Sequence, residues 1–249
     1  MKVSIKDIEK IFEIFKSTNP APATELHYSN TYELLVAVIL SAQCTDKRVN
    51  MVTPALFNAF PTIFDMAKAT PEMVFTYIKS ISYPNNKANN LVKMAKQVTE
   101  NYAGKIPDTT TELIKLPGVG QKTANVIVSV AFGQDALAVD THVFRVGKRL
   151  GLHSANTPEK AELQLIKIIP KKYLSNAHHW LILHGRYICT AKNPKCEQCL
   201  IKTYCNYYQQ HSSINNKNQK PWQKNLNQKK ASAKKQPSPQ RKKLVQKKA

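Results

Sequence analysis

The spacing of apolar residues along this chain predicts helices. Apolar residues recur at helical intervals between residues 5 and 15, which predicts an amphipathic first helix that Pro20 ends. The run from Leu34 to Leu40 is apolar on every side, so its helix should be buried in the centre of a domain. Residues 136–139 are apolar without alternation, and we interpret them as an extended link rather than a strand. We therefore predict an all-α body.

Cap residues mark where several of these helices begin. Asn30 with Glu33 resembles a capping box in front of the buried helix. Thr70 and Thr157 each precede a proline and a glutamate, the order that starts a helix. A long periodic stretch over residues 85–102 is predicted to end at Gly104.

Charge divides the chain into a body and a tail. The 249 residues carry 37 Lys and Arg against 16 Asp and Glu, a formal net charge of +21, which predicts a polyanionic partner such as nucleic acid. Residues 206–249 hold eleven Lys and one Arg and no acidic residue. From about Tyr208 onward large apolar residues are too few to drive folding, so we predict a disordered basic tail over residues 208–249.

The sequence indicates a cytoplasmic protein without a membrane segment. Its first residues do not resemble a signal peptide, and the apolar run from Leu34 to Leu40 is too short to cross a bilayer. A reducing cytosol suits free thiols. Cys44, which follows the apolar run, is interpreted as an inert buried thiol.

Four further cysteines lie close together near the end of the body, at Cys189, Cys196, Cys199 and Cys205. Structural zinc usually takes two Cys-x2-Cys pairs or a mixture of Cys and His, whereas this stretch has one such pair with wide, unequal arms. The spacing favours a [4Fe–4S] cluster over zinc. A disulfide pair is the weakest alternative, because nothing indicates an oxidising compartment.

A glycine-containing turn between two helical segments is a candidate DNA-binding element. Gly118, Val119 and Gly120 can form a tight turn whose N–H groups, with the next helix N-terminus, bind a phosphate oxygen. This is the helix-hairpin-helix pattern, which grips the DNA backbone without reading bases. The alternative is an ordinary corner between helices; the charge and the cysteines favour DNA binding.

Lys122 follows this turn and is a candidate nucleophile. A helix N-terminus, and burial of the site, would favour a neutral amine there. The alternative is a lysine that contacts phosphate. Asp140, eighteen residues later, is either the N-cap of the next helix or the carboxylate partner of Lys122.

Together these motifs resemble the endonuclease III family, helix-hairpin-helix DNA glycosylases with an associated lyase activity. The resemblance extends from the first helix to Cys205. Beside the four cysteines, the motifs that carry it are Leu40-Ser41-Ala42-Gln43-x-Thr45-Asp46, Leu116-Pro117-Gly118-Val119-Gly120-x-Lys122-Thr123-Ala124, Val139-Asp140-Thr141-His142 and the stretch from His178 to Tyr187.

The resemblance implies two α-helical lobes with DNA between them. A six-helix barrel lobe would span residues 24–134. An iron–sulfur cluster lobe would join residues 1–23 to residues 135–207, and the tail would follow over 208–249. We expect a monomer that acts on double-stranded DNA containing damaged bases or abasic sites, in the cytoplasm and associated with the nucleoid.

The same resemblance implies the chemistry of base excision repair. An oxidised pyrimidine is flipped out of the duplex, and Lys122 attacks the sugar C1′, expels the base and forms a Schiff base, with Asp140 assisting. β-Elimination then cuts the strand on the 3′ side. Gln43 lies where the family fills the hole left by the base, and Lys192 and Lys195 lie where it contacts phosphates.

One position departs from the family pattern. Where the family usually has Gly-Leu-Tyr-Asn, with leucine as a wedge, this chain has Ser82-Tyr83-Pro84-Asn85. Tyr83 could stack in the gap instead, since an aromatic face tolerates any base. The basic tail is a second departure, and it is expected to add DNA affinity that weakens with salt.

Two other functions remain as alternatives. A non-enzymatic DNA-binding protein whose cluster senses redox state would need the cysteines and the hairpin but not Lys122. A mismatch adenine glycosylase has a similar hairpin and cluster but lacks lysine at this position. The histidines at 178, 179 and 184 are interpreted as core residues rather than metal ligands.

Overall fold

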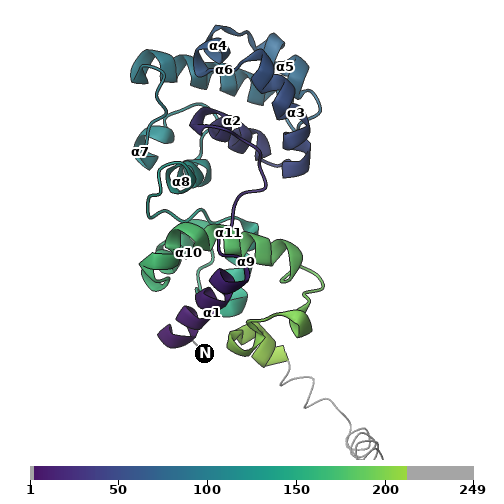
Figure 1. Ribbon diagram of the computed structural model, residues 1–249, viewed down its shortest axis with the longest axis vertical. Helices are drawn as coiled ribbons and strands as arrows, with labels where there is room; N and C mark the ends of the chain where they lie inside the picture. Colours follow the sequence, from purple (N-terminus) through teal and green to yellow (C-terminus); the bar gives the residue numbers. More distant parts are fainter. Residues whose placement is uncertain (1–2, 212–249) are drawn as a thin grey trace, which may run out of the picture. The chain divides into compact units, whose positions relative to one another are not determined.

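The computed structural model describes residues 3–211, and in this range it contains helices and no strand (Figure 1). The predicted all-α class is therefore confirmed. Residues 1–207 form one compact unit. Its helices are α1 Ile5–Thr18, α2 Thr31–Ser41, α3 Asp46–Ala59, α4 Ile63–Lys68, α5 Pro71–Ile78, α6 Pro84–Tyr102, α7 Thr110–Leu113, α8 Gln121–Val130, α9 Thr141–Leu150, α10 Pro158–Ile168 and α11 Lys171–Tyr187, with short 3-10 turns η1 Cys196–Gln198 and η2 Lys202–Tyr204.

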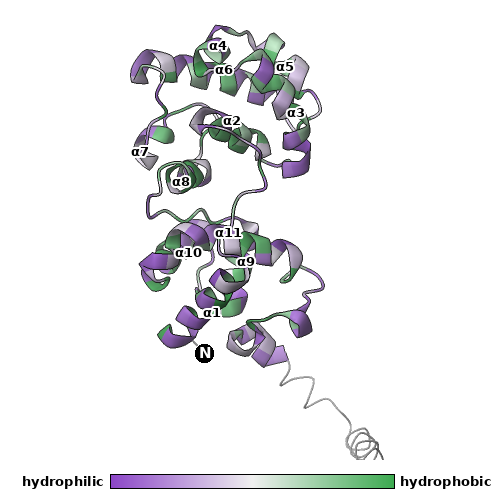
Figure 2. Cartoon of the chain, viewed as in Figure 1, coloured by the Kyte–Doolittle hydropathy of each residue, from purple (hydrophilic) through white to green (hydrophobic). Residues whose placement is uncertain are grey.

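Helix α2 forms the centre of the first group of helices. Every residue from Leu34 to Leu40 is buried, as the all-apolar run predicts. Its core cluster takes in residues from Leu26 to Ala138 and includes the inner faces of α3–α8, where apolar positions concentrate (Figure 2). Among the described residues no helix combines the length and apolar character needed to cross a membrane.

A second group joins the N-terminal helix to α9, α10 and α11. An aromatic cluster fixes α1 on α11: Phe12 stacks on Tyr173 at 5.8 Å between ring centroids, and Phe15 stacks on Trp180 at 6.4 Å. The indole of Trp180 also donates to the carbonyl of Asn19 at 2.8 Å. Residues at opposite ends of the body thus share one core.

The predicted helix starts at Asn30, Thr70 and Thr157 are confirmed, whereas the C-cap of α6 is Ala103 rather than the predicted Gly104. The side chains of Asn30, Thr70 and Thr157 accept hydrogen bonds from the first turns of α2, α5 and α10. The Glu33 carboxylate, however, accepts from the backbone N–H of Ser29 rather than from that of Asn30, so the predicted capping box is not formed reciprocally.

Two predictions concern segments outside the main helices, the link at residues 136–139 and the basic tail. Residues 136–139 are an extended link, as predicted, and residues 137–139 are buried. Most of the predicted disordered tail, residues 208–249, lies outside the described residues. The part that is described, residues 208–211, is helical, so the prediction of disorder from Tyr208 is wrong for these four residues.

Candidate active site and cysteine loop

A cavity of about 630 Å³ opens between the two groups of helices. Its walls come from the end of α2, the start of α8, the link into α9 and the middle of α11. Gln43, Lys122 and Asp140 all contribute to its lining, although they are far apart in sequence. The cavity can hold a small ligand, since small-molecule sites typically have volumes of several hundred Å³.

Lys122 is the second residue of α8 and reaches the cavity from the helix N-terminus. The backbone turn at Gly120 forms the N-cap of α8 and directs the first helical turn toward the cavity. The side chain of Lys122 is exposed. Its amine can therefore be reached by a ligand that enters the cavity.

Asp140 combines the two roles that the sequence left open. Its Oδ1 accepts a hydrogen bond of 2.7 Å from the backbone N–H of Val143, so Asp140 is the N-cap of α9. The same residue lines the cavity. The cap fixes the carboxylate in place, and the cavity holds it beside the wall that carries Lys122.

Buried histidines form the floor of the cavity. His178 and His179 are 5% and 8% exposed. The Nδ1 of His178 lies 2.6 Å from the carbonyl of Ala138, which can only accept, so the neutral ring donates from Nδ1. The pKa of His178 is lowered to about 4, mainly by burial and also by His179, while Asp140 opposes the shift. These residues are core groups, as interpreted from the sequence.

This burial predicts a loss of stability in mild acid. Because the pKa of His178 is lowered from 6.5 to about 4, the unfolded chain binds a proton below pH 6.5 that the folded protein does not accept. Stability is then lost as the pH falls from 6.5 toward 4, by about 2 kcal/mol between pH 7 and pH 5. Urea unfolding of the wild type and His178→Asn at both pH values measures this difference.

The exposed His27 provides the control for that measurement. The variant His27→Asn should keep the pH dependence of the wild type, whereas His178→Asn should lose about 2 kcal/mol of it. An equal pH dependence in all three proteins would show that His178 is protonated in the folded state.

The hairpin has one glycine that the fold requires and one that it does not. Gly118 has φ 80°, and a Cβ there would approach the Cβ of Asn90 to 3.0 Å. Gly120 has φ −92°, and a Cβ there would meet no atom within 4 Å. Val119 is buried and its N–H donates to the carbonyl of Leu116. The missing side chain at Gly120 thus leaves open space on the surface of the turn.

Gln43 and Tyr83 lie on adjacent segments. Both have left-handed backbone conformations, with φ of 55° and 56°, and both are exposed. The hydroxyl of Ser82 donates to the carbonyl of Gln43 at 2.8 Å, which joins the two segments. Gln43 lines the cavity, whereas Tyr83 lies outside its lining.

Sequence reasoning missed two charged residues near the cavity. Lys87 is 7% exposed and donates to the carbonyls of Leu40 and Ala42 at the end of α2. Its position four residues before the buried Leu91 on α6 was a signal that it faces the core. Arg186 from α11 pairs with Glu25 and, at 2.7 Å, with Asp46 at the start of α3. No sequence pattern indicates that pairing.

The four cysteines of the C-terminal loop come together at the ends of α9 and α11. Arg149 of α9 donates to the sulfur of Cys189 at 3.4 Å and to the carbonyls of Thr190 and Ala191. The sulfur of Cys199 lies 3.6 Å from the Nε2 of His184, and that of Cys205 lies 3.5 Å from the carbonyl of Arg149.

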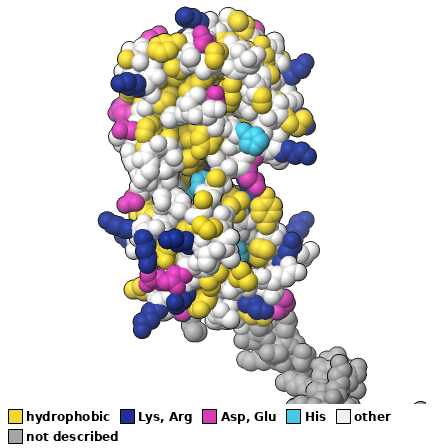
Figure 3. All heavy atoms as spheres, in the orientation of Figure 1, with side chains coloured by type: hydrophobic (Ala, Val, Ile, Leu, Met, Phe, Trp, Pro, Cys, Tyr) yellow, Lys and Arg dark blue, Asp and Glu magenta, His cyan; other side chains and the backbone are white. Residues whose placement is uncertain are grey.

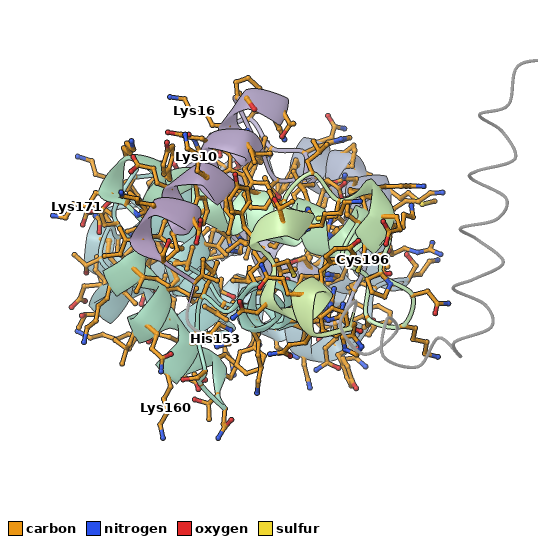
Figure 4. The ribbon with its side chains drawn as sticks, turned by 90° about the horizontal axis from the view of Figure 1, so that it is seen from below. Lys10, Lys16, His153, Lys160, Lys171 and Cys196 are labelled. Carbon is orange, nitrogen blue, oxygen red and sulfur yellow. The ribbon has the colours of Figure 1, made fainter. Side chains whose placement is uncertain are left out.

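The electrostatics of this loop fit a cationic centre. The pKa of the Cys199 thiol is raised to about 11, mainly by burial and also by the other three cysteines of the loop. Burial and Cys189 also raise the pKa of Cys196, which lies at the start of η1 (Figure 4). Four thiolates that disfavour one another's charge are compensated when they ligate iron, so this donor set fits an iron–sulfur cluster.

The spacing of the four cysteines along the chain bears on whether they hold an iron–sulfur cluster or a single zinc ion. In a [4Fe–4S] cluster each cysteine binds a different iron, so the ligands stand further apart than around a single zinc ion.

Two lysines of the cysteine loop are solvent-exposed. Lys192 and Lys195 lie between α11 and η1, outside the cavity lining. On the face of the molecule seen in Figure 3, Lys and Arg side chains are spread over both groups of helices rather than gathered in one patch. The two lysines thus lie on the surface, away from the cavity.

Comparison with known proteins supports the resemblance found in the motifs. Residues 36–171 match the family described as "HhH-GPD superfamily base excision DNA repair protein", and residues 189–205 match the "Iron-sulfur binding domain of endonuclease III". The second match includes all four cysteines of the loop and confirms the predicted [4Fe–4S] cofactor.

Individual relatives agree over most of the chain. Endonuclease III of Rickettsia felis is 52% identical over 201 residues, which are 81% of this chain and 94% of the relative. Endonuclease III of Escherichia coli K12 is 43% identical over 198 residues, 80% of this chain and 94% of the relative. A solved structure described as a trapped endonuclease III–DNA covalent intermediate has a TM-score of 0.78 at 42% identity, covering 84% of this chain and 99% of that one. The chain belongs to the endonuclease III family of helix-hairpin-helix DNA glycosylases.

Proposed function

We propose that the cavity is the active site at which this protein acts as a DNA glycosylase and AP lyase of base excision repair. The observation that carries the proposal is that Lys122 and Asp140 line one cavity directly after the hairpin turn. The protein binds DNA, and its substrate is double-stranded DNA with an oxidised pyrimidine or an abasic site. We propose that it acts as a monomer in the cytoplasm, at the nucleoid.

Lys122 is the proposed nucleophile. The neutral amine attacks C1′ of the extrahelical nucleotide, the bond from C1′ to the base breaks, and the base leaves with the bonding electrons and takes up a proton. The sugar opens to a Schiff base on the lysine nitrogen. Loss of a C2′ proton then expels the 3′ phosphate, which cuts the strand by β-elimination.

Asp140 is proposed to assist this attack. Because its Oδ1 is fixed by the cap bond to Val143, the carboxylate keeps one orientation while DNA binds. A carboxylate at this place accepts the proton of the attacking amine or balances the positive charge that develops on the sugar. The neutral ring of His178 beneath it adds no competing cation.

The remaining site residues are proposed to hold the DNA. Gly118, Val119 and Gly120 present the hairpin backbone to a phosphate. Gln43 and Tyr83 enter the duplex where the base has left. Lys192 and Lys195 contact phosphates further along the strand.

The four cysteines and the two groups of helices are assigned to the cluster and to the two lobes of the family fold. We propose that Cys189, Cys196, Cys199 and Cys205 ligate the [4Fe–4S] cluster, which holds the loop with its two lysines on α9 and α11. The barrel lobe would comprise residues 24–134 and the cluster lobe residues 1–23 and 135–207. The core cluster around α2 lies mostly within the barrel segment and also takes in Ala138 of the cluster segment.

Borohydride trapping tests the proposed activity. The protein is incubated with duplexes carrying thymine glycol, a natural abasic site, or adenine opposite 8-oxoguanine, and borohydride is added. A covalent protein–DNA adduct is expected with the first two. Release of adenine without an adduct would indicate the mismatch adenine glycosylase instead, and no reaction with any duplex would indicate the redox-sensing binding protein. The family relationship favours neither alternative.

The two hairpin glycines predict different defects. Gly120→Ala should cost less than about 1 kcal/mol of stability, because its φ is ordinary and a Cβ meets nothing. The added methyl group would separate the backbone N–H groups from a phosphate, and the loss of one charge-assisted hydrogen bond weakens DNA binding about tenfold. Fluorescence anisotropy with a labelled duplex measures the affinity.

Gly118→Ala is the matched comparison for that variant. Its φ of 80° and the close approach to Asn90 should lower stability by about 1–2 kcal/mol. If Gly120→Ala binds DNA as tightly as the wild type, the turn does not contact the phosphate backbone.

A further inference from the structure

We propose that Ser82 and Lys87 are positioning residues that hold Gln43 and Tyr83 as one rigid pair before DNA binds. This inference rests on the proposed function, because it assigns the two exposed side chains to the opening of the duplex. It adds how the protein fixes them, and which residues do so without touching DNA.

Backbone conformation singles out the two segments. Among residues 3–211, three residues other than glycine have positive φ: Gln43, Tyr83 and Ala103. Ala103 is the C-cap of α6, where this conformation is common. Tyr83 stands at a helix N-cap, where extended backbone is the rule. Such conformations disfavour large side chains and persist only where surrounding contacts enforce them.

A direct hydrogen bond joins the two residues. Ser82 immediately precedes Tyr83, and its hydroxyl donates to the carbonyl of Gln43 at 2.8 Å. The bond spans 39 positions in sequence and acts on the strained residue itself. Neither segment can therefore shift without breaking it or moving the other segment.

Lys87 fixes the same two segments from beneath. Its ammonium donates to the carbonyl of Leu40 at 2.9 Å and to that of Ala42 at 2.7 Å, at the end of α2 where carbonyls have no helical partner. Its backbone N–H donates to the carbonyl of Tyr83 at 3.1 Å and closes the first turn of α6. One buried residue thus holds the chain directly before Gln43 and directly after Tyr83.

The side chains that this arrangement holds point outward. Tyr83 is 61% exposed and Gln43 is also exposed, while Lys87 is only 7% exposed. A fixed backbone with exposed side chains lowers the entropy that is lost when the side chains enter DNA. The hydrogen bonds from Ser82 and Lys87 should therefore speed the extrusion of a paired base. They should have little effect on the rate of strand cleavage once the base is gone.

The variant Ser82→Ala tests this inference on the full-length protein. We expect single-turnover release of thymine glycol from a paired duplex to slow about tenfold, as for loss of one well-placed hydrogen bond, with a matching delay in the fluorescence of 2-aminopurine placed opposite the lesion. Strand cleavage at a preformed abasic site should change less than about twofold. Ser80→Ala, an exposed serine on the same segment, is the control.

Lys87→Met provides a second arm, with the exposed Lys93 of α6 replaced in the control Lys93→Met. Lys87→Met should show the same split between base release and strand cleavage, and Lys87→Arg should restore base release in part. If both steps slow by one factor, or if Ser82→Ala releases the base as fast as the wild type, the inference is wrong. Failure of the wild type to form the trapped adduct would instead reject the proposed function.

Discussion

Replacing Lys122 by alanine is expected to abolish the covalent adduct that borohydride traps between this protein and abasic-site DNA. The Schiff base needs a primary amine beside the extrahelical sugar, and Lys122 is the lysine on the cavity lining. Base release and strand cleavage should both fall by at least about a thousandfold, because the covalent route is lost. Denaturing gel electrophoresis after borohydride treatment measures the adduct. Because Lys122 is exposed, the fold should tolerate the change.

Lys171→Ala is the matched control for this variant. Lys171 is an exposed lysine in the first turn of α11, pointing into solvent and outside the cavity lining (Figure 4). The control should form the adduct like the wild type. An adduct of wild-type yield in Lys122→Ala would mean that another amine attacks the sugar.

The variant Asp140→Asn tests the negative charge of Asp140 separately from its role as a helix cap. Asparagine can accept the same hydrogen bond from Val143, so α9 should keep its N-terminus and the protein its stability. Loss of the negative charge should slow base release by about 10²–10⁴-fold. If this variant is as active as the wild type, Asp140 serves only as a cap.

Replacing Cys199 by serine is expected to cause the largest loss of stability. Cys199 is half-buried, and burial raises the pKa of its thiol to about 11, so the site favours a thiolate only when iron compensates the charge. Without the cluster the loop over residues 189–205 loses its attachment to α9 and α11. We expect the variant to lose iron and absorbance near about 400 nm, and its Tm to fall by at least about 10 °C.

Cys44→Ser is the control for the cluster prediction. Cys44 lies outside the cysteine loop, so this variant should retain its iron and its colour. Iron and zinc are measured together by mass spectrometry. Colourless wild-type protein with stoichiometric zinc would contradict the cluster assignment.

Local patterns in the sequence specified the helices because they act over a few residues. The apolar run from Leu34 to Leu40 predicted a buried helix, and Asn30, Thr70 and Thr157 marked helix starts that the structure confirms. The first signal depends on how often apolar side chains recur along a few helical turns. The second depends on a hydrogen bond from the cap side chain to a residue three positions away. The same locality explains why the cysteine spacing already favoured the correct cofactor.

Contacts across long separations in sequence could not be predicted in this way. The residues themselves offered Lys122 as a candidate nucleophile and Asp140 as either a helix cap or its carboxylate partner, and the family resemblance favoured the pairing. The path of α2 and α6 decides that the ammonium of Lys87 meets the carbonyls of Leu40 and Ala42.

The amino-acid sequence was enough to predict an all-helical body, the helix starts that cap residues mark, the set of four cysteines and the candidate nucleophile. Only the folded structure shows that residues from α2, α8, α9 and α11 enclose one cavity, and that Ser82 bonds to Gln43. The physical reason is the distance along the chain over which each kind of interaction acts. Propensity and capping act between neighbours in the chain, whereas the meeting of side chains dozens of residues apart depends on how the helices pack against one another.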